Sequence, residues 1–141
     1  MMSRLIAVGL LIAACLFAGC GRKNDLGVVP TSGTVTHNGQ PVADLFLNFE
    51  PASGRPSWAL TDANGQFNAV YTSHLPGVLP GECRVWVTIR PKSVDEEQQL
   101  LKGNLPRAVE LADLLKKYGR KTSPLNLTIA PGQGPITLQL D

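Results

Sequence analysis

Strong charge of one sign is absent from this sequence. Its 141 residues contain 13 basic and 11 acidic side chains, which gives a formal net charge of +2. Arg4 lies in an apolar leading segment, and removing that segment lowers the net charge to +1. Nucleic-acid phosphates are bound by a concentrated basic face. The near balance of charge therefore argues against nucleic acid as a partner.

Long hydrophobic runs are absent after residue 20, and aromatic residues make up only 6% of the chain. The 14 glycines and 11 prolines are spread between short apolar runs, a spacing that is typical of β domains with many turns. The length suits one domain. The sequence contains no internal repeat and no low-complexity tract.

The one longer apolar run opens the chain. Leu5–Ala18 follows Arg4 and is uncharged. It has about fourteen residues, fewer than the roughly twenty that span a bilayer, and it has the size of a signal-peptide core. The run ends in Leu16–Cys20 (LFAGC), which resembles a bacterial lipobox. The resemblance implies that residues 1–19 are a lipoprotein signal peptide. It also implies that Cys20 carries a diacylglycerol thioether and an N-acyl chain such as palmitate.

Two other interpretations of this segment are open. Ile12–Cys15 is a second candidate cleavage motif, but cutting there would leave a very short apolar run and an apolar mature start. The other interpretation is that the segment is an uncleaved anchor or a plain secretory signal. Phe17 stands in place of the leucine that is usual in a lipobox. Several acyl chains on Cys20 would anchor the protein stably, and Gly21 in place of Asp favours the outer membrane. We expect an extracytoplasmic envelope protein held in a membrane by lipid.

Cysteine is scarce in the rest of the chain. Once Cys15 is removed and Cys20 is lipidated, Cys83 stands alone, so no internal disulfide is possible. Cys83 alternates with apolar residues in a strand-like segment, which favours a buried thiol that packs as a small hydrophobe. A reactive thiol would need a neighbouring base, and the sequence places none.

Seven short segments with alternating apolar residues predict strands. They are 33–37, 42–50, 57–61, 66–72, 82–90, 125–129 and 136–140. Asn38-Gly39 predicts a type I′ hairpin, and Asp62–Gly65 predicts a turn in which the Asp side chain bonds the backbone. In 82–90, the odd-numbered residues from Cys83 are expected to face inward and Arg84, Trp86, Thr88 and Arg90 to face outward.

The pattern changes between residues 92 and 119. Residues 93–101 are charged and weakly helical, and a helix of roughly fifteen residues follows, with Asn104 as its cap and Pro106 in its first turn. Gly119 is expected to end it in a left-handed conformation. The residues expected on its apolar face are Leu105, Ala108, Val109, Ala112 and Leu115. We therefore predict a seven-stranded antiparallel sandwich over residues 30–141 with one inserted helix, joined to the lipid by a tether at 20–29.

Three stretches of the chain resemble carboxypeptidase regulatory-like domains. They are Ser32–Val42 (SGTVTHNGQPV), Thr61–Phe67 (TDANGQF) and Pro80–Val85 (PGECRV). The resemblance covers residues 30–141 apart from 92–116. It implies a transthyretin-like (prealbumin-like) Greek-key sandwich, usually an accessory or adhesive module without catalysis of its own. Together with the lipobox, the chain is similar to the small envelope lipoproteins of planctomycete-type bacteria.

Several residue groups are candidates for chemistry. Asp62 and Asn64 resemble part of a Ca²⁺ loop, but a full site needs six to eight oxygens, and the turn interpretation is favoured. His37 and His74 lack further ligands at metal-binding spacing; with Cys83 they are also what a hydrolase would have to use. A basic cluster is a candidate contact for anionic lipid or cell-wall polymer, or else a solvated helix end. Its members are Lys116, Lys117, Arg120 and Lys121.

Phe46 and Trp86 are the candidate ligand contacts. Both are expected to face outward, where they would either stack on a sugar or a partner or pack beneath the inserted helix, and the helix is favoured because its apolar face must cover something. We expect a noncatalytic envelope lipoprotein, a structural or binding module with no cofactor. The alternative is an accessory protein that binds carbohydrate or peptide at the cell surface, and a hydrolase is the third hypothesis.

Overall fold

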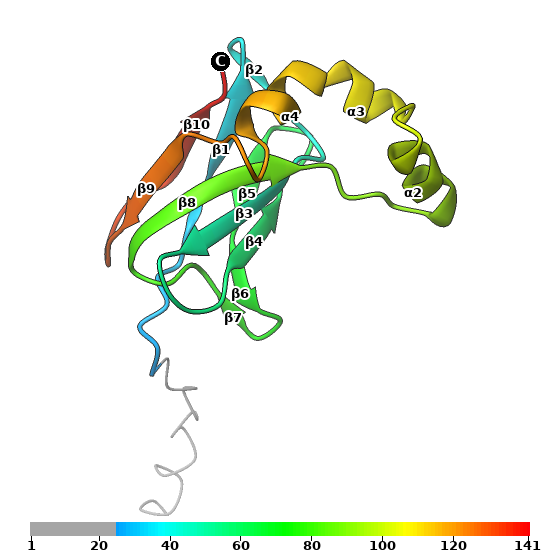
Figure 1. The fold of residues 1–141 in the computed structure, drawn as a ribbon. Helices are drawn as coiled ribbons and strands as arrows, with labels where there is room; N and C mark the ends of the chain where they lie inside the picture. The colour runs from blue at the N-terminus through cyan, green and yellow to red at the C-terminus, as the bar shows by residue number, and fades with distance from the viewer. Residues whose placement is uncertain (1–24) are drawn as a thin grey trace, which may run out of the picture.

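Two facing β-sheets and three helices form the domain in the computed structural model, which describes residues 25–141 (Figure 1). The expected signal peptide and Cys20 lie outside the described residues. The strands are β1 (Ser32–His37), β2 (Gln40–Pro41), β3 (Phe46–Pro51), β4 (Ser57–Leu60), β5 (Gln66–Asn68), β6 (Val70–Thr72), β7 (Leu75–Pro76), β8 (Gly81–Thr88), β9 (Leu125–Ile129) and β10 (Ile136–Gln139). The helices are α2 (Val94–Leu101), α3 (Pro106–Glu110) and α4 (Ala112–Tyr118).

The larger sheet has six strands in the order β7-β6-β4-β3-β8-β9. The smaller sheet has the order β10-β1-β2, and β5 also pairs with β1. The predicted all-β sandwich is thus confirmed as an architecture. One pair departs from the antiparallel expectation, because β1 and β10 run parallel along Gly33–Thr36. The connection from β9 to β10 passes from one sheet to the other, so no hairpin forces β10 to run against its neighbour.

Each of the seven expected segments contains a strand, and the additional strands arise in two ways. β2 and β7 are two-residue strands next to turns. The expected strand 66–72 is divided: β5 pairs with β1 in the smaller sheet, whereas β6 pairs with β4 in the larger one. The chain changes sheets at Ala69, whose N–H donates to the Thr31 carbonyl (2.8 Å).

The space between the sheets is filled by the inward side chains that alternation predicts. Those of β3 and β8 are almost fully buried, as are Phe67 and Ala69 at the change of sheet. Val28 and Val29 are also buried, and Val29 forms a backbone bridge with Val78. The compact domain therefore begins before residue 30, and the end of the expected tether belongs to its core.

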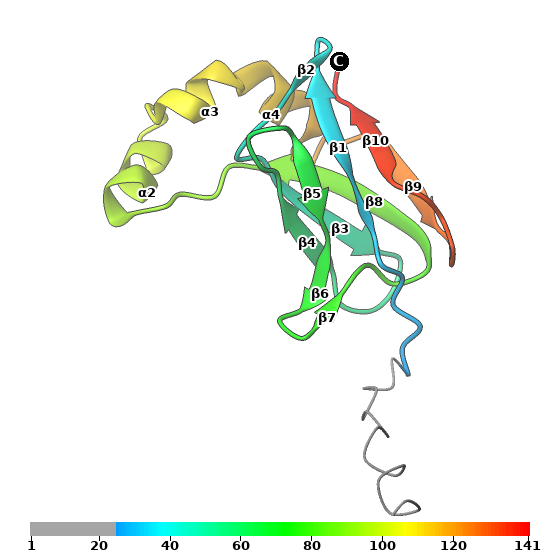
Figure 2. The same cartoon turned by 180° about the vertical axis from the view of Figure 1, so that it is seen from behind.

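The inserted segment forms three helices. Ser93 caps α2 by accepting a hydrogen bond from the Glu96 N–H (3.2 Å), and no residue of α2 is buried. α3 and α4 follow each other and are separated at Leu111, which has φ −98° and ψ 17°. α3 and α4 lie at one end of the sandwich, opposite the end at which the described chain enters, and α2 projects to the side of the domain (Figures 1 and 2).

The apolar face expected for this helix is confirmed in part, because Leu105 is buried and both Ala108 and Leu115 pack against the core. The residues that join the core are Leu105, Leu111, Leu114 and Tyr118, whereas Val109 is 57% exposed. The expectation is wrong at Val109 and Ala112, which are exposed, whereas Leu111 at the break between the two helices is buried. Within α4, Leu114 and Tyr118 follow Leu111 at ordinary helical spacing. The expected left-handed stop is also wrong, because Gly119 has φ −68°.

Side-chain contacts fix the helices to the end of the sandwich. Arg107 donates to the Ala43 carbonyl (2.7 Å), and the Tyr118 hydroxyl donates to the Asp141 carbonyl (2.7 Å). The contact of Arg107 lies just before β3, and that of Tyr118 lies after β10. α3 and α4 therefore cover the open end between the two sheets and do not cover the outer surface of either sheet.

A close approach in the smaller sheet makes a prediction about stability. A Cβ at Gly33 would overlap the Ile136 carbonyl oxygen and stand 2.8 Å from Cζ of Phe67. We expect Gly33→Ala to lower the free energy of unfolding by about 3 kcal/mol, in the range of overpacked cores. Gly134→Ala, with open space around its Cβ, should change it by less than about 0.5 kcal/mol. Urea denaturation of both variants measures this, and equal midpoints would contradict it.

Candidate functional site

The outer surface of β4, β3 and β8 carries three aromatic side chains of the larger sheet. We call Phe46, Trp58, Leu60 and Trp86 the aromatic face. The strand register brings them together: Phe46 pairs with Leu60, and Asn48 pairs with Trp58 on one side and Trp86 on the other. Directly opposed residues point to the same side of a sheet, so these residues lie on one surface.

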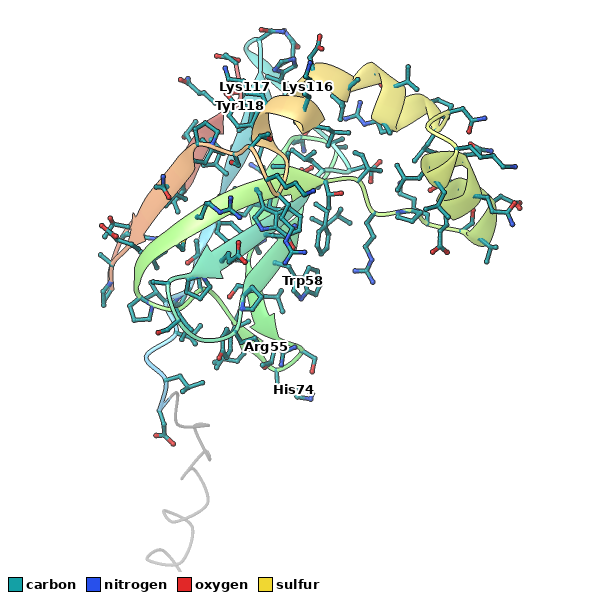
Figure 3. The ribbon with its side chains drawn as sticks, in the orientation of Figure 1. Arg55, Trp58, His74, Lys116, Lys117 and Tyr118 are labelled. Carbon is teal, nitrogen blue, oxygen red and sulfur yellow. The ribbon has the colours of Figure 1, made fainter. Side chains whose placement is uncertain are left out.

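The rings of this face are stacked and flanked by arginines. Phe46 and Trp58 have centroids 5.6 Å apart and planes inclined by 16°. The Arg90 guanidinium lies 5.6 Å from the Phe46 centroid, and that of Arg120 lies 5.7 Å from the Trp86 centroid. Trp58 is 38% exposed, and its side chain points away from the sandwich (Figure 3). Leu60 is likewise exposed, and Phe46 and Trp86 are half-buried.

The side chains of β4 face the opposite way from what their hydrophobicity would predict. Ser57 and Thr61, at its start and just after its end, are buried, whereas Trp58 and Leu60 face solvent. The Thr61 hydroxyl accepts from the Leu45 N–H (2.9 Å), but the Ser57 hydroxyl has no partner. An unpartnered buried hydroxyl costs about 1–3 kcal/mol. The strand therefore buries polar groups while it presents a tryptophan and a leucine to the outside.

The structure places the two candidate ligand contacts on this face, both outward as expected. The favoured interpretation placed them beneath the inserted helix. The buried residues of α3 and α4 instead join the core between the sheets, to which neither Phe46 nor Trp86 belongs, and Arg120, just after α4, lies over the Trp86 ring. Trp58 and Leu60 were missed. The signal that could have found them is the alternation of the small residues 57, 59 and 61 with large ones.

Two hollows adjoin the aromatic face. One of about 340 Å³ is lined by Leu60, Arg90 and Lys92 among others. The other, of about 500 Å³, lies over β3, β8 and β9 and is lined in part by Glu50, Arg84 and Asn126. The first hollow is bordered by Arg90, by the Lys92–Asp44 ion pair and by apolar atoms. The second is bordered by groups that donate and groups that accept hydrogen bonds.

Some of the charged side chains around the aromatic face form ion pairs. Arg84 pairs with Glu50 (3.0 Å), and Lys92 pairs with Asp44 (3.0 Å). Within residues 25–141, Arg90 and Arg120 form no ion pair with a carboxylate. The two guanidinium groups that cover the rings are therefore the uncompensated cations of this surface.

The two histidines lie at opposite ends of the sandwich. His37 ends β1 beside the helices, whereas His74 lies in the turn between β6 and β7 (Figures 1 and 3). His37 donates from Nδ1 to the Leu140 carbonyl and accepts at Nε2 from the Asn38 amide (3.3 Å). They cannot share a metal, and with Cys83 they form no nucleophile–base pair. Across residues 25–141, no group of three or more His, Cys, Asp or Glu could hold a metal ion.

The Asp62 turn is confirmed. Asp62 Oδ1 accepts from the backbone N–H groups of Asn64 (2.8 Å) and Gln66 (2.9 Å), and Gly65 has φ 71°. One carboxylate oxygen is thus bonded to the turn itself. The type I′ hairpin is confirmed as well, because Asn38 and Gly39 have φ of 51° and 76°.

The basic cluster is divided between two surfaces. Lys117 donates to the Asp141 carbonyl and lies over the Tyr118 ring, whereas Arg120 lies over Trp86 on the aromatic face. Lys117 and Arg120 therefore contact different surfaces of the domain. None of the helices within residues 25–141 has the length and apolar character needed to cross a membrane.

Comparison with known proteins adds no relative: no family model, no curated protein and no solved structure matches this chain.

Cys83 is buried, as its pattern predicts. Burial raises the pKa of its thiol from 9.0 to about 11, because the thiolate loses hydration in an apolar environment. At pH 8 this lowers the thiolate fraction about 100-fold, and the thiolate is the reactive form.

We expect Cys83 to react slowly with an aromatic disulfide reagent in the native protein at pH 8 and fast in urea, with Cys83→Ala giving the background. Because folding raises the pKa of the Cys83 thiol, the protonated thiol contributes to the free energy of unfolding. This contribution is complete below pH 9 and is lost as the pH rises through about 11. Urea midpoints between pH 8 and 11 should fall more for the parent than for Cys83→Ala. Fast native labelling at residue 83 would contradict the prediction.

Proposed function

We propose that this chain is a noncatalytic lipoprotein of the bacterial cell envelope, anchored in a membrane through Cys20. The lipobox-like LFAGC at residues 16–20 carries this proposal. The anchoring chemistry needs small residues before the cysteine and an apolar run of signal-peptide length, and both are present. Gly21 favours the outer membrane.

The entry of the chain into the domain supports the same assignment. Val28 and Val29 are already in the core, so residues 21–27 form the whole link to the anchor. Seven residues span at most roughly 25 Å when extended. The domain would therefore sit close to the bilayer, with α3 and α4 at the end that points away from it (Figure 2).

The finer fold is part of the proposal. We assign the sandwich to the transthyretin-like, carboxypeptidase regulatory-like type, with seven principal strands in Greek-key order. The type I′ hairpin after β1 and the Asp62 turn, which belong to the resembling segments, support it. An accessory or structural role follows from that resemblance.

A second candidate function is an accessory protein that binds carbohydrate or peptide at the cell surface. The aromatic face favours it, because Trp58 and Leu60 are presented outward by a strand that buries serine and threonine instead. Exposed apolar residues gathered on one surface mark interaction sites.

Replacing the lipidated residue tests the anchor. The parent should incorporate a labelled palmitate analogue and remain with the membrane fraction, whereas Cys20→Ala should lose the label and remain uncleaved. Cys15→Ala is the matched control and should behave as the parent. Mass spectrometry of the mature N-terminus identifies the cleavage position. Label that persists in Cys20→Ala, or that disappears in Cys15→Ala, would refute the assignment to Cys20.

A further inference from the structure

We propose that the aromatic face binds an acidic polysaccharide, a glycan whose sugars carry carboxylate groups. The assignment deepens the carbohydrate-binding role proposed above and does not depend on the lipid anchor. The ring faces of Trp58 and Trp86 would contact the C–H surface of the sugars. Arg90 and Arg120 would contact the carboxylates.

Unsatisfied groups on and under this surface indicate that it serves a ligand. Asn48 lies between Trp58 and Trp86 in the strand register, and its Nδ2 has no hydrogen-bond partner. The Ser57 hydroxyl behind Trp58 is unpartnered as well. A sequence that served stability alone would place Trp58 inside and the serine outside. Departures from the local rules of folding gather at functional sites.

The position of the face favours a glycan over a peptide. The residues lie on β4, β3 and β8, which are interior strands of the six-stranded sheet. Their backbone groups already bond to neighbouring strands, so an extended peptide could not add to the sheet here, as it does at an exposed edge. A ligand on this face meets side chains only. The faces of aromatic rings carry negative charge, which suits the weakly positive C–H groups of a sugar ring.

The arginines favour a ligand with carboxylates. Arg90 and Arg120 have no carboxylate partner within the described residues, and each lies over a ring of the face. A guanidinium group binds a carboxylate through two parallel hydrogen bonds. When each arginine turns to a carboxylate, it uncovers the ring beneath it. The hollow of about 340 Å³ gives one carboxylate a place next to Arg90, beside Lys92 and its ion-pair partner Asp44.

The other end of the surface supplies groups for sugar hydroxyls. Glu50, Arg84 and Asn126 lie in register across β3, β8 and β9, one row beyond Asn48 and Trp86. They border the hollow of about 500 Å³. Carboxylate, guanidinium and amide groups together donate and accept hydrogen bonds, as neighbouring hydroxyls require.

Tryptophan fluorescence reports on this face directly, because Trp58 and Trp86 are the two tryptophans of the chain. The full-length protein in detergent is titrated with polygalacturonate, alginate and hyaluronate. At least one polymer should shift the emission and bind saturably at 150 mM salt. Methyl-esterified polygalacturonate, which has the same sugars without the negative charge, should bind at least tenfold more weakly than polygalacturonate wherever the latter binds.

Variants locate the site. Trp58→Ala and Arg90→Gln should each weaken binding about tenfold, as measured by calorimetry, since Trp58→Ala also changes the fluorescence. Lys102→Gln removes an exposed cation at the end of α2 and should bind as the parent. Urea denaturation shows that each variant remains folded.

Three outcomes overturn the proposal. The first is that none of the three polymers binds. The second is equal binding of polyglutamate, which would assign the face to acidic peptides. The third is equal loss in Lys102→Gln and Arg90→Gln, which would reduce the binding to general charge attraction. A Cys20→Ala protein that lacks the lipid but still binds polygalacturonate in detergent separates this site from the anchor, so each proposal can fail without the other.

Discussion

The pairing register of β3 with β4 and β8 is the constraint on which the rest of this molecule depends. It buries Leu47 and Phe49 between the sheets, and it simultaneously sets Trp58, Asn48 and Trp86 in one row on the outside. A slip of one residue would reverse both faces of a strand. The stability of the core therefore holds the outer row in place, and the aromatic face needs no support of its own.

The helices determine which surfaces stay open. α3 and α4 place their buried residues against the core between the sheets, and the contacts of Arg107 with Ala43 and of Tyr118 with Asp141 hold them there. An inserted helix in the expected position would have covered Phe46 and Trp86. α3 and α4 close an end of the sandwich instead. The side chains on the outer face of the larger sheet therefore contact one another and two arginines.

Local signals predicted the strands and turns well. Alternation identified all seven principal segments, and positive φ at Asn38 and Gly39 followed from residue type. Non-local features were not predicted. The parallel pairing of β10 with β1 depends on how the last connection crosses the sandwich. The division of segment 66–72 at Ala69 depends on its pairing with β1 on one side and β4 on the other, both distant in the chain. The apolar face of the inserted helix was predicted in part: Ala108 and Leu115 pack against the core as expected, but Leu111, at the break between α3 and α4, is buried where Ala112 was expected.

Two of the four residues of the aromatic face could be predicted from the sequence, and the other two could not. Phe46 and Trp86 were found because their strands alternate normally and they fall on the outward positions. Trp58 was missed because hydrophobicity would place it inside, in a strand whose inward neighbours are Ser57 and Ala59. A large apolar side chain fully buried in the core would contribute about 1.5–3 kcal/mol, whereas Trp58, stacked on Phe46 but 38% exposed, gains only part of this. Under the proposal, a glycan that covers Trp58 would complete this burial, so the strand that breaks the hydrophobic pattern is also the strand that supports the proposed site most directly.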